Sequence, residues 1–234
     1  MTYPFSLITG TLTMRLPDRP DPLPYEWFTI SVNPDASRTL RVVTVSPDAS
    51  LVRDSSQVHD ASWAPLEGYL RLIRDGELFG SLVRKVEGGT VRSYYFDGEG
   101  RVTQGERDVL EGMTFGFHSV AANPWKFAQH TGAPGPQPLP VLTHSLTWNG
   151  GTVGLGEVSN TELELVGKET ITVPAGTFEC DHYVWSTEVD GVIEVWTTGE
   201  ERIYVRGHQH TRDIVYELAS LDRAQSGAPV AAPA

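Results

Sequence analysis

The feature that most constrains this chain is residues 170–185, where a Pro-Ala-Gly turn joins two β-like runs. The first run ends at Val173, Pro174–Gly176 follow, and the second run alternates from Thr177 to Trp185. Proline removes a ladder donor and glycine accepts turn backbone, so this segment predicts a tight hairpin rather than one continuous strand. A hairpin of this length commits this part of the chain to a β-sheet.

Short runs of the same kind recur along the chain, separated by turn residues. The 234 residues include 23 glycines and 16 prolines, a frequency that favours many short strands over long helices. Asp75-Gly76, Gly88-Gly89 and Asp190-Gly191 predict two-residue hairpins. The predicted strands are residues 5–16, 27–32, 39–46, 50–59, 68–74, 78–87, 90–97, 143–148, 162–173, 176–189, 192–198 and 202–206, and residues 213–221 are predicted as strand or short helix. The sequence therefore predicts an all-β fold, a strongly curved antiparallel sheet that forms an open or closed barrel.

The middle of the chain breaks this pattern. Residues 119–140 combine an apolar stretch with a segment rich in glycine and proline, which predicts one or two helical turns followed by a long irregular loop. Residues 1–223, with this segment included, fit one barrel-like domain, because all-β domains commonly reach this size without dividing. Alanine and proline dominate residues 224–234, and we expect a disordered tail there.

Charge and composition exclude several classes of partner. The chain carries 18 Lys+Arg against 30 Asp+Glu, a formal net charge of −12, which would repel nucleic acid and anionic membrane surfaces. Cys180 is the single cysteine, so no internal disulfide forms. Residues 1–16 lack a basic leader, and no run approaches the roughly 20 apolar residues of a membrane span. We therefore expect a cytoplasmic protein without a membrane partner, and a homodimer stays open.

The turn at Val173–Phe178 and its flanking strands, from about Leu163 to Trp196, resemble the DUF3108-like bacterial families of unknown function. Gly68–Leu72, followed by Asp75-Gly76, is compatible with the earlier hairpins of those families. The resemblance implies a curved antiparallel sheet, open or half closed, around an apolar, lipocalin-like cavity. Many such relatives carry an export signal, which this sequence lacks, and the resemblance implies no catalytic residues.

His182 is the first candidate for chemistry. Strand alternation places it on one face with Phe178 and Cys180, and Tyr183 and Trp185 on the other. If the His182 face points inward, an imidazole among apolar neighbours is how a general base near neutral pH is made. The alternative is a structural histidine that bonds a backbone carbonyl.

A second group of candidates surrounds the central excursion. His118 precedes it and is expected at the rim of the sheet, while Trp125 and His130 lie on it. Trp125 could stack on a flat ligand while a histidine exchanges a proton. Alternatively, Trp125 only anchors the loop to the body of the protein.

Further candidates lie on the predicted strands. Arg202 beside Tyr204 could hold a carboxylate or an enolate oxygen, although a salt bridge from Arg202 to a neighbouring glutamate is the simpler interpretation. Tyr94 and Tyr95 face opposite sides of their strand, so one of them is expected to reach the interior. Trp196 is expected to shape the pocket.

His208 and His210 give a weaker metal-binding alternative. Their spacing puts both imidazoles on one face if the chain is extended there, with zinc as the expected ion. A third ligand would come from Glu194, Asp213, Glu200 or His182, and the alternative is a polar turn.

Two functional hypotheses follow. The sequence has no phosphate loop, nucleophile elbow or dinucleotide fingerprint. The first hypothesis is a cofactor-independent lyase, hydratase or isomerase that acts by proton transfer on a small apolar or aromatic molecule, with His182 and His118 as base and acid, and Tyr94 or Tyr95 with Arg202 as oxyanion partners. The second is a non-catalytic binding or carrier protein for a small hydrophobic ligand.

Overall fold

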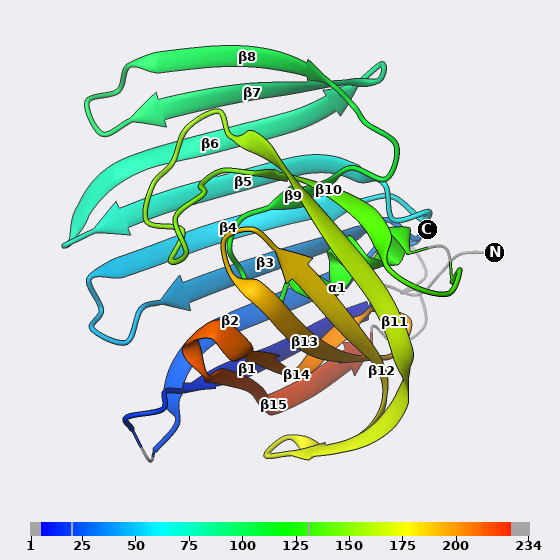
Figure 1. Cartoon of the computed structure of the whole chain (residues 1–234). Coiled ribbons are helices and arrows are strands. Elements are labelled where there is room, and N and C mark those ends of the chain that lie inside the picture. Colours follow the sequence, from blue (N-terminus) through cyan, green and yellow to red (C-terminus); the bar gives the residue numbers. More distant parts are fainter. Residues whose placement is uncertain (1–5, 20, 131, 226–234) are drawn as a thin grey trace, which may run out of the picture.

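Strands account for nearly all regular structure in this protein. The computed structural model describes residues 6–19, 21–130 and 132–225, which form one 15-stranded sheet (Figure 1). The strands are β1 (Ser6–Arg15), β2 (Leu23–Val32), β3 (Arg38–Val45), β4 (Leu51–His59), β5 (Pro65–Arg74), β6 (Glu77–Glu87), β7 (Thr90–Asp97), β8 (Val102–Asp108), β9 (Thr114–Gly116), β10 (Gln137–Thr143), β11 (Glu157–Val173), β12 (Gly176–Thr187), β13 (Gly191–Thr198), β14 (Ile203–Gln209) and β15 (Ile214–Gln225). The short helix α1 (Asn123–Lys126) continues into a 3₁₀ turn at Phe127–Gln129, and a second 3₁₀ turn follows β14 at His210–Arg212.

The strand order places the two ends of the described chain side by side in the middle of the sheet. The order is β8-β7-β6-β5-β4-β3-β2-β1-β15-β14-β13-β12-β11-β10-β9, and Ser6 of β1 pairs with Gln225 of β15. Consecutive strands from β1 to β8 are antiparallel neighbours, because each is joined to the next by a short turn. The predicted turns at Asp75-Gly76, Gly88-Gly89 and Pro174-Ala175 are two-residue hairpins, as expected.

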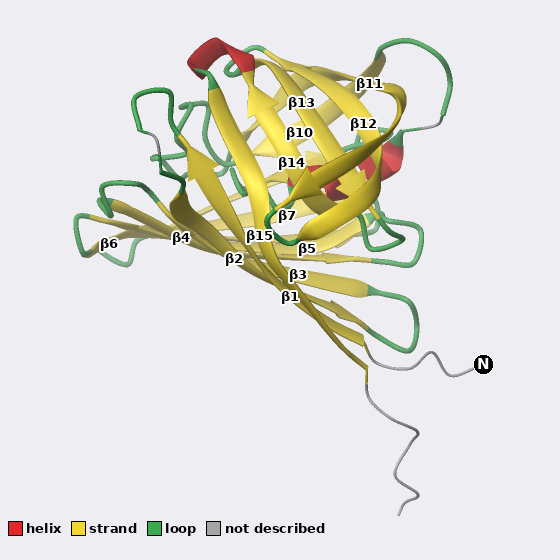
Figure 2. Ribbon diagram, turned by 90° about the horizontal axis from the view of Figure 1, so that it is seen from below, coloured by secondary structure: helices red, strands yellow, loops and turns green. Residues whose placement is uncertain are grey.

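The sheet is curved and open. Within the described residues no ladder joins the edge strands β8 and β9, which confirms the open option of the predicted barrel. The sheet folds over itself, so that β10–β14 lie above β1–β6 with α1 between the two layers (Figure 2). The sheet is mixed rather than purely antiparallel, because β9 pairs with β10 in parallel. The segment that includes α1 connects the end of β9 to the start of β10. It returns the chain so that β10 runs in the same direction as β9.

The core lies between the two layers. Trp125 and Phe127 are fully buried and pack with Ile8 and Leu12 of β1 in the larger apolar cluster. A smaller cluster forms around Phe115 and Phe117 against β5 and β6. The apolar side chains of the segment that includes α1 therefore fill the space between the two layers of the sheet. Among the residues that the structure describes, no helix has the length and apolar character to span a membrane.

Arg84 of β6 joins the two layers where the sheet is open. Its side chain is fully buried, and its guanidinium donates to the carbonyl oxygens of Leu142 at 2.6 Å and of Thr143 and Leu155 at 3.0 Å. Burial lowers its pKa to about 9, so the group remains charged at neutral pH. A charged donor to three carbonyls in a dry site fastens β10 onto β6 without a ladder between them.

Several local predictions are wrong. The short strand β9 was not predicted, and the stretch predicted as an irregular loop up to residue 140 already contains the start of β10 at Gln137. Residues 143–148 form no strand; the strand in this region is β10, which ends at Thr143, where the chain turns to meet Arg84. The hairpin predicted at Asp190-Gly191 has a three-residue loop, since Thr187 pairs with Gly191. β8 was not predicted, because its pattern is polar on both faces. β15 extends to Gln225 and so includes the first two residues of the predicted tail, while residues 226–234 lie outside the described residues.

Replacing Arg84 tests this closure. Arg84→Met removes the donor from the carbonyls of Leu142, Thr143 and Leu155, so we expect the free energy of unfolding to fall by on the order of 3 kcal/mol. Urea denaturation measures this change. Arg71→Met, on the exposed side of β5, is the matched control and should change it by no more than about 0.5 kcal/mol. Equal effects of the two substitutions would contradict the role of Arg84.

Candidate functional site

A cavity of about 410 Å³ lies between the two layers. Its size falls within the range of small-molecule sites in proteins. Residues from β1, β2, β4 and β9, from the segment that includes α1, and from β10–β15 line it. One part of the wall is apolar and includes Val141, Leu146, Trp148, Trp185 and Ile193.

Two buried cations line the polar part of the cavity. Lys126 is 2% exposed and donates from Nζ to Asn123 Oδ1 at 2.7 Å, and the Trp185 ring lies 4.9 Å from the ammonium. Arg53 is 3% exposed and donates to the Asn149 carbonyl and to the Tyr25 hydroxyl. Its Nε is buried without a hydrogen-bond partner.

The partners of both cations are neutral. Within the described part of the chain, no carboxylate oxygen lies within 4 Å of the charged nitrogens of Lys126 or Arg53. Burial lowers the pKa of Lys126 to about 8, with opposing attraction from Glu26 and Asp190. A buried charge is expensive unless it is paired, so the cavity wall favours an anion.

The nearby carboxylates are engaged elsewhere. Glu26 is fully buried and accepts hydrogen bonds from Thr44 Oγ1 and from the backbone N–H groups of Val120 and Ala121, at 2.8–2.9 Å. Burial raises its pKa above the usual value. This carboxylate therefore holds the segment that precedes α1 in place. Asp190 accepts from Gln209 at 2.7 Å and pairs with Arg212 at 3.2 Å.

Tyrosine hydroxyls add neutral polar groups to the same cavity. Tyr25, Tyr204 and Tyr216 line it, and the Tyr25 and Tyr216 rings lie 5.2 Å apart. Burial raises the pKa of all three phenols, so each remains protonated and can donate a hydrogen bond. The polar wall thus combines two cations with three neutral donors.

Of the residues predicted from the sequence, His118 and Tyr204 line this cavity. His118 Nε2 lies 2.9 Å from the Ser145 carbonyl oxygen. Burial and the nearby Arg53 lower the pKa of His118 to about 3. An imidazole with such a pKa is neutral at pH 7 and is a weak base there.

His182 and Trp196 lie on the opposite side of the sheet wall. Trp185 lines the cavity, and alternation along β12 turns His182 the other way. The His182 ring stacks on Trp196 at 4.3 Å, and its Nδ1 lies 2.7 Å from Glu169 Oε1. The structure therefore does not bring His182 and His118 to one cavity.

The other predicted residues also lie outside the cavity lining. Trp125 is fully buried and donates from Nε1 to the Glu201 carbonyl at 3.1 Å, an arrangement that fits the anchoring interpretation. Arg202 Nη1 lies 3.5 Å from the Tyr183 hydroxyl, and the His130 ring meets the same tyrosine edge-on at 5.9 Å. Tyr94 is 37% exposed. Tyr95 packs against the smaller apolar cluster, and burial raises its pKa.

The sequence prediction missed Arg53 and Lys126, and each left a weak signal. β4 alternates so that Leu51, Arg53, Ser55, Gln57 and His59 are its buried residues, which is an unusually polar inward face. Lys126 stands between two aromatic residues in an otherwise apolar segment. Both observations indicate a polar interior rather than a solvated face.

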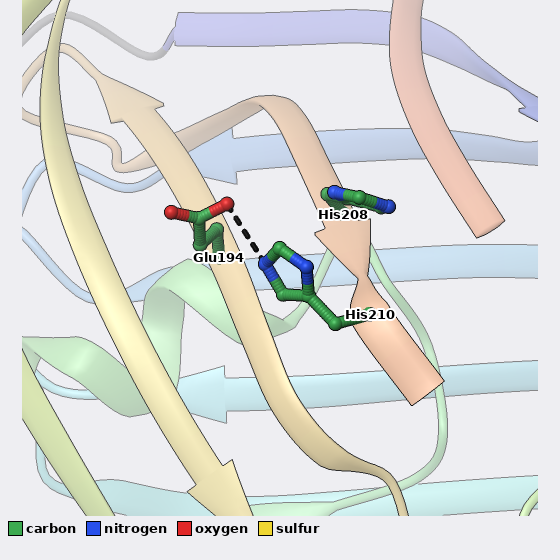
Figure 3. A group of neighbouring side chains, drawn as sticks. All are labelled: Glu194, His208 and His210. Carbon is green, nitrogen blue, oxygen red and sulfur yellow. Dashed lines mark hydrogen bonds and ion pairs between the residues drawn. The ribbon is translucent and has the colours of Figure 1, made fainter. Parts of the chain in front are cut away.

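The histidines of the metal-binding alternative do come together. On the outer face, ligand atoms of Glu194, His208 and His210 lie within 4.8 Å of one another (Figure 3). His210 Nε2 lies 2.9 Å from Glu194 Oε2, and His208 Nε2 lies 2.8 Å from Asp213 Oδ1. Neighbouring residues Ile193 and Gln209 line the cavity, so β13 and β14 separate this cluster from it.

Comparison with known proteins supports the fold alone. No protein-family model and no curated protein matches the sequence, so the resemblance to DUF3108-like families stays a prediction. A β-barrel-like protein of the domain of unknown function DUF1849 from Brucella abortus is similar in structure, with a TM-score of 0.59 and 12% identity over 95% of this chain and 99% of that one. A DUF1089 family protein from Pseudomonas aeruginosa has a TM-score of 0.44 and 11% identity over 77% and 88% of the two chains. The first likeness shows a shared β-barrel-like fold.

Replacing Lys126 tests whether its buried charge is uncompensated. The pKa of Lys126 is about 8 in the folded protein and 10.5 in the unfolded reference, so the folded state disfavours the charged amine. Lys126→Met should therefore raise the free energy of unfolding at pH 7, by about 1–3 kcal/mol. Between pH 8 and pH 10.5 the unfolded wild type binds more protons than the folded one, so wild-type stability should rise and the difference should shrink.

Urea denaturation at pH 7 and pH 10 measures this effect. Lys168→Met is the control, because Lys168 is 81% exposed, and it should leave stability nearly unchanged at both values. A Lys126→Met protein that is less stable than wild type at pH 7 would show that the charge is already compensated.

Proposed function

We propose that the protein binds a small amphipathic acid, with the carboxylate of the ligand beside Lys126 and Arg53 and its apolar part against the tryptophans of the cavity. The observation that carries this proposal is the pair of buried cations whose hydrogen-bond partners are all neutral. This is the carrier hypothesis with a more specific ligand, since the polar wall selects an acidic head group.

The chemistry of the wall supports an acid over a neutral molecule. A carboxylate that reaches Lys126 Nζ or the Arg53 guanidinium makes charge-assisted hydrogen bonds, which are about twice as strong as neutral ones. It also removes the penalty of an unpaired buried charge. Trp148 and Trp185 offer large apolar surfaces to the rest of the ligand.

The proton-transfer hypothesis has less support from the geometry. It requires a base and an acid at one cavity, and of the two proposed histidines only His118 lines it. A pKa of about 3 makes His118 a poor base at neutral pH, because general bases work best when their pKa lies near the working pH. Binding without catalysis is therefore the function that the site supports best.

A comparison of decanoate with decanol tests the proposal. The two probes share their apolar chain and differ in the charged head group. We expect wild-type protein to bind decanoate at least tenfold more tightly, because only the carboxylate pairs with the buried cations. Isothermal titration calorimetry, or quenching of fluorescence from the cavity tryptophans, measures both dissociation constants. Decyl phosphate, a third probe, distinguishes a preference for carboxylate from a preference for any anion.

Two variants locate the binding site. Lys126→Met and Arg53→Met should each weaken decanoate binding by roughly 10- to 100-fold and leave decanol binding nearly unchanged. Lys168→Met and Arg71→Met are exposed controls and should retain wild-type affinity. The proposal fails if decanoate and decanol bind equally well, or if the control variants lose as much affinity as the cavity variants.

A further inference from the structure

We infer that Glu194, His208 and His210 form a binding site for a divalent transition-metal ion, with zinc as the ion that the donors fit best (Figure 3). The site lies on the outer face of β13 and β14, so it is distinct from the proposed acid-binding cavity. Two imidazoles and one carboxylate are a common ligand set for zinc in sites that keep a fourth position open.

The spacing of the donors is close to what coordination requires. Bonds of about 2.0–2.1 Å in a tetrahedral site place the ligand atoms roughly 3.3 Å apart. Glu194 Oε2 and His210 Nε2 are already 2.9 Å apart, and all three donors lie within 4.8 Å of one another. The side chains of His208 and His210 are 27% and 45% exposed, so small side-chain rotations can bring both imidazoles closer to Glu194.

The backbone explains why these residues meet. Glu194 and His208 are paired directly across the β13–β14 ladder, which brings their side chains to the same face. The 3₁₀ turn that begins at His210 then folds back, and the two imidazole rings lie 4.2 Å apart. Asp213 follows with a left-handed backbone, φ 51°, and its carboxylate contacts His208.

His182 provides a second, independent observation. Its side chain is 8% exposed, its Nδ1 contacts Glu169, and its Nε2 is buried without a hydrogen-bond partner, 3.4 Å from Glu194 Oε1. The flat contact with Trp196 fixes the ring in this direction. His182 therefore faces one oxygen of Glu194, while the other oxygen faces His210. In metal sites, groups outside the ligand shell commonly contact a ligand in this way and hold its orientation.

The surrounding charges favour a cation. Glu194 and Asp213 both contact the histidine pair, and the chain as a whole carries a net charge of −12. The two arginines on β14 and the turn after it have carboxylate partners of their own, since Arg206 lies 3.9 Å from Glu217 and Arg212 pairs with Asp190 at 3.2 Å. Imidazole nitrogens favour zinc over magnesium or calcium, which prefer oxygen ligands.

Zinc titration of the untagged full chain tests this inference. Equilibrium dialysis with Zn²⁺ alone should give one ion per chain with a dissociation constant in the low micromolar range or below. The double variant His208→Ala/His210→Ala should lose at least 100-fold in affinity, and Glu194→Gln at least tenfold. His130→Gln removes one imidazole away from the cluster and should change the affinity by less than twofold. Circular dichroism establishes that each variant is folded.

Cobalt gives a second readout that does not depend on affinity. Co²⁺ bound to the wild type should show the intense visible bands of a four-coordinate ion, and these bands should be absent from the double variant. The inference is overturned if the wild type binds no stoichiometric zinc at tens of micromolar, or if the double variant binds it as tightly as wild type does. Loss of binding in His130→Gln would overturn it as well.

Discussion

The structure depends on one buried guanidinium. Within the described residues the edges of the 15-stranded sheet do not pair, so the apolar core and Arg84 together hold the two layers in contact. The side chain crosses from β6 to the end of β10 and satisfies carbonyls of Leu142, Thr143 and Leu155. Phe115 and Phe117 lie 5.6 and 5.3 Å from the guanidinium carbon, so the contact is dry and strong. Gly156 has a φ of 88°, and a Cβ there would collide with the Thr143 carbonyl and with Arg84.

The two layers that Arg84 joins enclose both apolar and charged side chains. The layers enclose α1 and its apolar neighbours, but they also enclose Lys126 and Arg53, whose direct partners are neutral. The negative surface of the protein and the positive patch inside it thus have different roles. We expect the surface charge to favour solubility, and we propose that the internal cations make the cavity selective for the charge of its occupant. The same strands β13 and β14 present the histidine and glutamate cluster on their other face.

Much of the fold could be predicted from local sequence, because hairpins depend on a few neighbouring residues. Pro174-Ala175, Asp75-Gly76 and Gly88-Gly89 each form the expected turn. Strand alternation identified the two faces of β12 but not which face is interior, since His182 and Trp185 alternate equally well on either side. The strand predicted at residues 143–148 is absent, and β10 instead ends at Thr143, whose carbonyl accepts a hydrogen bond from Arg84, 59 residues earlier in the sequence.

The candidate site was less accessible to sequence reasoning. Arg53 and Lys126 come from β4 and α1, and no spacing rule connects them. His118 was selected together with Trp125 and His130, and Tyr204 together with Arg202, but of these the structure places only His118 and Tyr204 at the cavity. His182 was selected by a pattern that fits either face. Of the predicted groups, the structure brings together the residues of the metal-binding alternative, because a strand pairing and a short turn place Glu194, His208 and His210 side by side.

The central claim is that a ligand carboxylate pairs with two cations inside the folded sheet whose hydrogen-bond partners are neutral. Its most direct test is the titration of the bound ligand itself, using decanoate labelled with ¹³C at the carboxyl carbon and nuclear magnetic resonance between pH 7 and pH 4. Pairing with Lys126 and Arg53 favours the ionised acid, so the pKa of bound decanoate should lie at least about one unit below that of free decanoate. A bound pKa equal to the free value, or above it, would contradict the account.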